Sequence, residues 1–262
     1  DLATTAGSAI APLQHGDMAS LGLTGWTPAG IIRWSFELIN VTTHLPWFHT
    51  IVLGCAFWKL VTLPLNVIGL RNSMRMLPIQ AEVQKIQGVV AEARKTGDIA
   101  LMQKQSAVMK ELYAKAGVSG FGMMAPLLQL PVTLGLFFGV RKMCELPLAQ
   151  LAWSGFEYLP NLTEPSWAIA AIFTAAVNLQ IHIGKYELNL RDRPSSGHLM
   201  NLIHAMSTMG FFVAGFWPSG LVLALTTTSL FTSIQSLLLR VPAVRRLFAI
   251  PSLTKEERGR PP

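Results

Sequence analysis

The chain has 262 residues, of which 13% are charged and 51% are apolar, and its formal net charge is +7. Soluble domains carry about 25% charged residues, so this composition argues against a water-soluble enzyme and equally against a disordered chain. The positive charge favours anionic partners, either lipid headgroups or nucleic acid. The two cysteines, Cys55 and Cys144, lie far apart and predict neither a disulfide framework nor a zinc site.

Five apolar stretches are long enough to cross a hydrocarbon core about 30 Å thick, and their unbroken apolarity favours helices over a barrel. They cover residues 48–70, 121–140, 167–184, 200–217 and 221–239. The predicted fold is therefore an all-α polytopic membrane protein with five transmembrane helices.

The distribution of Lys and Arg predicts the orientation. Segments 71–120, 185–199 and 240–262 lie on one side of a five-helix topology and hold 17 of the 21 basic residues. By the positive-inside rule this side faces the inner compartment, so the N-terminal segment 1–47 and the loop 141–166 are outside. Four tryptophans fall near the outer boundary, as in an interfacial aromatic belt: Trp47, Trp153, Trp167 and Trp217.

Residues 31–42 read as a short amphipathic helix on the outer leaflet. Its apolar face, toward the lipid, would consist of Ile31, Ile32, Phe36 and Ile39, and its polar face of Arg33, Glu37 and Asn40. In the second span, Gly135 and Gly139 are spaced for close helix packing.

The inner segment 71–120 contains two apolar stripes separated by the turn signal Gly97-Asp98. Their members are Ile79, Val83, Ile86, Val90 and Ala93, followed by Ile99, Met102, Met109, Leu112 and Ala116. This pattern predicts an antiparallel coiled-coil hairpin. The alternative is two independent amphipathic helices on the inner leaflet.

Basic side chains on this segment are candidates for contact with anionic partners such as nucleic acid, because basic patches bind phosphate chains without sequence preference. Binding to the membrane surface is the alternative. The candidates are Arg71, Arg75, Lys85, Arg94, Lys95, Lys104 and Lys110.

Lys59 stands at the twelfth position of the span 48–70, near its middle. A lysine at that depth costs about 2.5–3.5 kcal/mol on insertion scales. None of the five spans contains Asp or Glu, so the sequence offers no intramembrane ion-pair partner. We therefore expect Lys59 to be the cation of a hydrated groove.

Uncharged polar residues in the spans are candidates for lining this groove. They are Asn66, Gln129, Thr133, Asn178, Thr228, Thr232 and Gln235. For the hydroxyl residues the alternative is ordinary hydrogen bonding between helices. Nucleotide-binding loops and hydrolase or zinc-protease motifs are missing, so we expect no enzymatic activity, catalytic residue, metal or cofactor.

Several stretches, in order over about residues 47–240, resemble the YidC/Oxa/Alb family of membrane-protein insertases. Lys59 ahead of Leu63-Pro64-Leu65 resembles the family's basic residue, usually Arg, upstream of a Pro-Leu pair. Three further stretches resemble the end of the family's hairpin, the next helix and a later turn: Glu111-Leu112-Tyr113, Pro126 to Pro131, and Trp217-Pro218-Ser219-Gly220-Leu221-Val222-Leu223.

Within the family, the chain is similar to the mitochondrial oxidase-assembly branch through Leu45-Pro46-Trp47, Leu162-Thr163, the segment 239–245 and Ile250-Pro251. This resemblance implies the mitochondrial inner membrane, with the N-terminus in the intermembrane space and the C-terminus in the matrix. Its implied partners are nascent or newly imported membrane proteins, membrane lipids, and the mitochondrial ribosome through the hairpin and the basic tail 240–262. Members of this branch usually have a longer tail than one ending at Pro262, so a paralogue that handles oxidase subunits after synthesis remains an alternative.

The expected function is insertion of hydrophobic segments into the membrane, with short hydrophilic flanks crossing through the polar groove. Two alternatives stay open: a small anion transporter or channel, and a non-catalytic assembly scaffold for respiratory-chain subunits. The sequence leaves the oligomeric state open.

Overall fold

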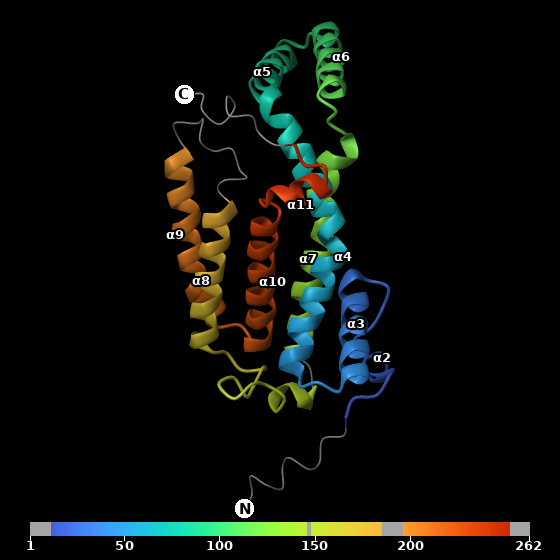
Figure 1. The fold of residues 1–262 in the computed structure, drawn as a ribbon, viewed down its shortest axis with the longest axis vertical. Coiled ribbons are helices and arrows are strands. Elements are labelled where there is room, and N and C mark those ends of the chain that lie inside the picture. The colour runs from blue at the N-terminus through green and yellow to red at the C-terminus, as the bar shows by residue number, and fades with distance from the viewer. Residues whose placement is uncertain (1–11, 146–147, 185–195, 252–262) are drawn as a thin grey trace, which may run out of the picture. The chain divides into compact units, whose positions relative to one another are not determined.

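A computed structural model of the chain describes residues 12–145, 148–184 and 196–251 (Figure 1). Within these ranges the regular structure is helical. The elements are α2 (Asp17–Ser20), α3 (Pro28–Thr43), α4 (Trp47–Met76), η1 (Leu77–Ile79), α5 (Gln80–Thr96), α6 (Ile99–Lys115), α7 (Gly120–Glu145), η2 (Ala149–Ala152), α8 (Trp167–Gly184), α9 (Ser196–Ala214), α10 (Ser219–Leu238) and α11 (Pro242–Leu247).

Four helices in the described ranges are long and apolar enough to cross a membrane. They contain the first, second, third and fifth predicted spans and correspond to α4, α7, α8 and α10. The stretch predicted as the fourth span forms α9, whose apolar part, Met200–Ala214, is shorter. The helical membrane fold is thus confirmed, and the fifth crossing stays a prediction. Residues 185–195 of the predicted loop 185–199 and residues 252–262 of the predicted tail 240–262 lie outside the described residues.

The chain divides into two compact units. The first combines Asp1–Thr62 with Leu130–Leu238, and the second combines Leu63–Gln129 with Leu239–Pro262. The boundaries fall inside α4, next to Pro64, and inside α7, next to Pro131.

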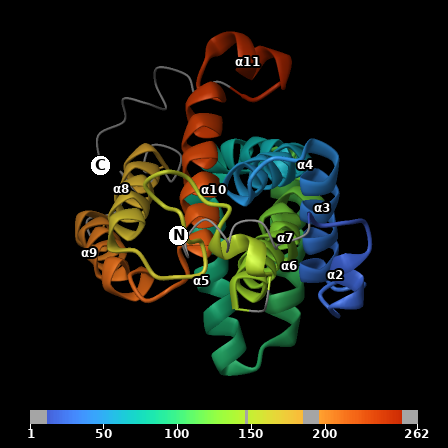
Figure 2. The same cartoon turned by 90° about the horizontal axis from the view of Figure 1, so that it is seen from below.

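In the first unit, α8 packs against both α10 and α9, and Figure 2 shows α8 between the other two helices. A continuous hydrophobic core joins α3, the first half of α4, the second half of α7, the loop after α7, α8 and α10. The side chains that project away from this core on α4, α7, α8 and α10 are largely apolar. Such an outward surface is what a lipid environment requires.

The prediction that the polar side chains of the helix at 31–42 face water is wrong. Arg33 and Glu37 are only 7% and 2% exposed, whereas Ile31 and Trp34 are exposed. Glu37 is buried because its Oε1 accepts hydrogen bonds from the backbone N–H groups of Gly16 (2.7 Å) and Met18 (3.3 Å) at the start of α2. A carboxylate is favoured at a helix N-terminus, whose N–H groups have no partner within the helix.

Helix α3 packs directly on α7 at the glycine pair predicted for close packing. A Cβ atom on Gly135 would lie 2.7 Å from Ile32 Cδ1, and one on Gly139 would lie 3.4 Å from the Ala29 carbonyl. The absence of side chains at these two positions lets the helices approach. α3 is therefore an integral part of the first unit's core.

The segment from Leu148 to Ser166 closes one end of the first unit. The N–H groups of Ser219 and Gly220, at the start of α10, donate to the carbonyls of Glu164 (2.9 Å) and Leu162 (2.8 Å), and Ser219 Oγ donates to Asn161 O (2.8 Å). Trp47, predicted for an interfacial belt, is instead fully buried, and its Nε1 donates to Gln150 Oε1 (3.1 Å). It anchors this segment rather than facing lipid.

In the second unit, α5 and α6 pack against each other, and a two-residue turn joins them (Figure 1). Gly97 ends α5 with a left-handed φ of 73°, and the side chain of Asp98 caps α6 by accepting from Leu101 N (2.9 Å). The predicted turn is thus confirmed. Val83, Ile86 and Ala93 of the first predicted stripe are buried. In the second stripe the first member, Ile99, is 68% exposed.

Two side chains from the end of α4 fix the segment between α6 and α7. Asn72 is buried, and its Oδ1 accepts from Ser119 N (2.8 Å). Arg75 donates from Nη1 to the Gly117 carbonyl (2.7 Å). These bonds determine where the hairpin joins α7 within the second unit.

We expect Asn72→Ala to lower the free energy of unfolding by about 1–3 kcal/mol, because it removes the acceptor of a partly buried N–H group. Thermal unfolding of the detergent-solubilised protein measures the change. Asn201, exposed on α9, provides the matched control Asn201→Ala. Equal melting temperatures for the two variants would mean that the Asn72–Ser119 bond does not stabilise the unit.

Candidate functional site

Lys59 lies on α4 between a side covered by protein and a side facing outward. Cys55 and Thr62, one turn before and after it, are buried. Phe57 and Leu60 are exposed, the latter by 68%, and Lys59 itself is partly buried. The ammonium group is thus at the edge of the protein packing in the first unit.

The ammonium group of Lys59 donates a hydrogen bond to Thr232 Oγ1 on α10, at 2.6 Å. Its charge has no carboxylate partner: the ion pairs found among the described residues are Glu92–Lys95, Glu111–Lys115 and Arg141–Glu145. An uncompensated cation in a membrane helix is costly, and such residues are generally functional. Thr232, predicted as a polar neighbour, is the side chain that contacts it.

Five hydroxyl groups between residues 226 and 233 of α10 donate their protons to the backbone of α10 itself. Thr232 donates to Thr228 O (2.7 Å), and Thr228 donates to Leu225 O (2.9 Å). Thr226, Thr227 and Ser233 make equivalent bonds one turn back. A hydroxyl oxygen that donates in this way keeps lone pairs that accept further bonds, and Lys59 uses one of them.

Neighbouring contacts fix the rotation of α4 and therefore the direction of Lys59. Trp58 Nε1 donates to Ser35 Oγ on α3 (2.9 Å), and Cys55 Sγ lies 3.7 Å from the Ala224 carbonyl on α10. Thr62 donates to the carbonyl of Trp58 (2.9 Å). Sequence reasoning missed Ser35, Cys55 and Thr62, although the positions of Cys55 and Thr62 relative to Lys59 put them on one helix face.

Asn178 belongs to a different polar cluster. Its Oδ1 lies 2.8 Å from His204 Nδ1 on α9, and its Nδ2 donates to Thr174 O on α8 (2.9 Å). The Asn178–His204 contact joins α8 to α9, which is the helix-packing role that polar residues commonly have in membranes. The structure gives no bond between Asn178 and the Lys59–Thr232 pair.

The other predicted lining residues belong to different units. Gln235 is partly buried on α10, and Thr133 is exposed on α7, both in the first unit. Asn66 and Gln129 are partly buried and belong to the second unit. Of the predicted set, the structure joins Lys59 to Thr232 and Thr228.

Most of the predicted basic contact residues are accessible in the second unit. Lys85, Arg94, Lys95, Lys104 and Lys110 are exposed on α5 and α6. Lys95 is 3.3 Å from Glu92, an exposed pair that contributes little to stability. Arg71 and Arg75 are partly buried at the end of α4, where Arg75 bonds to Gly117.

A sequence model of the 60Kd inner membrane protein family matches residues 38–245. This range contains α4 with Lys59, the α5–α6 pair and α7 to α10. The chain belongs to the 60Kd inner membrane protein family. The family assignment agrees with the resemblance found in the sequence motifs.

The relatives of this chain include mitochondrial and bacterial proteins. The chain is 28% identical to mouse "Mitochondrial inner membrane protein OXA1L" over 88% of its own length and 54% of the relative. It is 25% identical to "Mitochondrial inner membrane protein OXA1" of Saccharomyces cerevisiae, over 92% and 59%. It is 27% identical to "Membrane protein insertase YidC 1" of Streptococcus pyogenes, over 73% and 66%. The chain thus spans little more than half the length of the mitochondrial relatives.

Proposed function

We propose that the protein is a membrane-protein insertase of the mitochondrial inner membrane. The observation that carries the proposal is the cation of Lys59, hydrogen-bonded to Thr232 and without a carboxylate partner, on a helix apolar enough to cross a membrane. The family membership and the names of the relatives, which include a membrane protein insertase and mitochondrial inner membrane proteins, support it.

The physical task of an insertase is to lower the cost of moving a polar flank through hydrocarbon. A polar group that leaves water without a new hydrogen-bond partner costs several kcal/mol, of the order of 2–7 kcal/mol. In the proposed groove, Lys59 attracts acidic groups and the hydroxyl oxygens of α10 accept from N–H groups. The apolar segment of the client meanwhile partitions into lipid, so no nucleotide is needed.

In this proposal α9 also crosses the membrane, which gives five spans and places the N-terminus in the intermembrane space and the C-terminus in the matrix. The excess of Lys and Arg in segments 71–120 and 240–262 supports this orientation. The α5–α6 pair then projects into the matrix as an antiparallel coiled coil, supported by the buried Val83, Ile86 and Ala93.

Clients are nascent or newly imported membrane proteins. The exposed basic side chains of α5 and α6 would receive them or contact ribosomal RNA, because a surface of unpaired cations attracts polyanions at a distance. Lys85, Arg94, Lys104 and Lys110 carry this part of the proposal.

Site-specific photocrosslinking during translation tests the function. A photoreactive amino acid at Thr228, one turn from Thr232, is expected to crosslink to client chains while they are being inserted. The matched control places the same amino acid at Leu230, which is exposed on another face of α10. We expect at least about fivefold more client crosslinking from position 228, since only that face adjoins Lys59.

The same experiment separates the two alternatives. A scaffold that assembles finished subunits would crosslink to mature proteins and not to translating chains. An anion transporter would give no client crosslinks, and liposomes containing it would pass anionic solutes in the absence of any client. Either result would contradict the insertase.

A further inference from the structure

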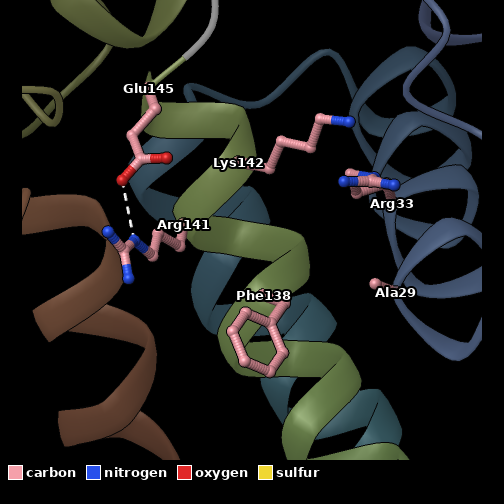
Figure 3. Close-up of a pocket in the computed structure, with 6 residues that line it drawn as sticks. All are labelled: Ala29, Arg33, Phe138, Arg141, Lys142 and Glu145. Carbon is pink, nitrogen blue, oxygen red and sulfur yellow. Dashed lines mark hydrogen bonds and ion pairs between the residues drawn. The ribbon is translucent and has the colours of Figure 1, made fainter.

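A pocket of about 570 Å³ opens between α3 and α7 in the first unit, away from the Lys59–Thr232 pair. Figure 3 shows its lining, in which three of the six side chains are cationic. The lining residues are Ala29, Arg33, Phe138, Arg141, Lys142 and Glu145.

The single carboxylate of the pocket is already engaged. Glu145 Oε1 lies 2.7 Å from Nε of Arg141, one turn earlier on α7. Figure 3 shows Lys142 extending from α7 toward Arg33 on α3, while Arg141 and Glu145 extend together to the other side of α7. Two cations from different helices thus approach each other, and neither belongs to an ion pair among the described residues.

Arg33 is the unusual member because it is 93% buried, with 7% of its surface exposed. Its Nε is buried and has no hydrogen-bond partner in the described part of the chain. Glu37, one turn away on α3, does not neutralise it, since that carboxylate accepts from the N–H groups of Gly16 and Met18. A buried guanidinium nitrogen without an acceptor is costly, and an anion in the pocket that accepts from it would remove that cost.

Burial also lowers the pKa of Arg33 below its ordinary value, because the charged form loses solvation. A guanidinium remains protonated at neutral pH even so. Arg33 and Lys142 are therefore both cations when an anion arrives.

We propose that this pocket binds the phosphate group of an anionic phospholipid, held by Arg33 and Lys142. Guanidinium and ammonium groups are the side chains that recognise phosphate, and basic pockets between membrane helices bind lipid headgroups. The pocket lies at the end of α7, a helix able to cross a membrane, where headgroups are expected.

The surroundings favour a lipid over free phosphate. Phe138 and Leu134 are about half exposed on α7, and Trp34 is 55% exposed on α3. Phe138 lines the pocket and Leu134 lies one turn before it on α7, so both offer contacts for an acyl chain. Trp34 follows Arg33 in the chain, and tryptophan is typical of the membrane interface. Inorganic phosphate would use the cations alone.

Native mass spectrometry of the full chain, released from detergent micelles with added lipid, tests the proposal. We expect phosphatidylglycerol to bind the wild type at least about tenfold more tightly than zwitterionic phosphatidylcholine does. Arg33→Gln and Lys142→Gln should each weaken phosphatidylglycerol binding about tenfold, since each removes one charge-assisted contact. Lys142→Arg, which keeps the charge, should bind like the wild type.

A matched control, Lys104→Gln, removes an exposed cation from α6 and should leave lipid binding unchanged. If Arg33→Gln fails to fold, the difference in phosphatidylglycerol affinity between Lys142→Gln and Lys142→Arg still tests the proposal. Equal affinity for the two lipids, or unchanged binding by Lys142→Gln, would overturn the proposal. Displacement of phosphatidylglycerol by an equal concentration of inorganic phosphate would overturn the assignment of a lipid as the occupant.

Discussion

Lys59→Glu is expected to reduce the insertion of clients with acidic flanks at least about tenfold, whereas Lys59→Arg keeps it within about threefold. The first substitution turns an attraction into a repulsion at the position bonded to Thr232. The second preserves the positive charge, although the planar guanidinium donates with different geometry. Reconstituted liposomes, with protease protection of the translocated flank as readout, measure the effect.

Clients with neutral flanks serve as the control, because the charge at position 59 does not act on them directly. Their insertion by Lys59→Glu should fall less than that of clients with acidic flanks. Unfolding of the variant would impair both kinds of client alike, so the ratio between them isolates the electrostatic effect. Equal activity of Lys59→Glu and Lys59→Arg on acidic clients would count against the groove-charge mechanism.

Gly220→Ala is expected to lower the free energy of unfolding by about 1–3 kcal/mol, in the range found for overpacked cores. A Cβ atom at this position would lie 2.9 Å from Cys144 Sγ and 3.1 Å from the Leu162 carbonyl. The backbone cannot easily move away, since Gly220 N donates to that carbonyl at 2.8 Å. The added methyl group therefore disrupts the contact between the start of α10 and the segment that covers it.

Gly210 on α9 is the matched control, because a Cβ atom there meets nothing within 4 Å. Gly210→Ala should be neutral or stabilising by up to about 1 kcal/mol, since alanine favours a helix over glycine. Cys55 and Cys144 are both buried, so a thiol-reactive dye reports unfolding of the wild type and of each variant. The packing argument is wrong if both alanine variants melt at the same temperature.

Local patterns predicted the helices well because each rests on residues close in sequence. The length and apolarity of α4, α7, α8 and α10 required no tertiary information, and the turn at Gly97 and Asp98 followed from the residues themselves. The burial of Glu37 could not be predicted in this way. It depends on the N–H groups of α2, some twenty residues away, and the sequence carries no periodic signal for that contact.

The candidate site was predictable in part, because some of its residues stand out in the local sequence. The depth of Lys59 in an apolar stretch marks it without a structure, and the hydroxyl residues of α10 mark possible partners. Which hydroxyl meets the ammonium group depends on how α4 and α10 are rotated, and the Trp58–Ser35 bond contributes to that. Sequence patterns did not connect Arg33 with Lys142, because their convergence arises from the packing of α3 on α7.

The internal bonding of the α10 hydroxyl groups has a consequence for client selectivity. Since Thr228 and Thr232 donate their protons to α10 itself, neither hydroxyl has a hydrogen left to offer an incoming carboxylate. Amide hydrogens of a passing peptide meet the oxygen atoms of Thr228 and Thr232, whereas an aspartate or glutamate is attracted by the ammonium of Lys59 beside them. Position 59 would then act mainly on acidic sequences, while sequences rich in asparagine and glutamine would depend more on the threonines.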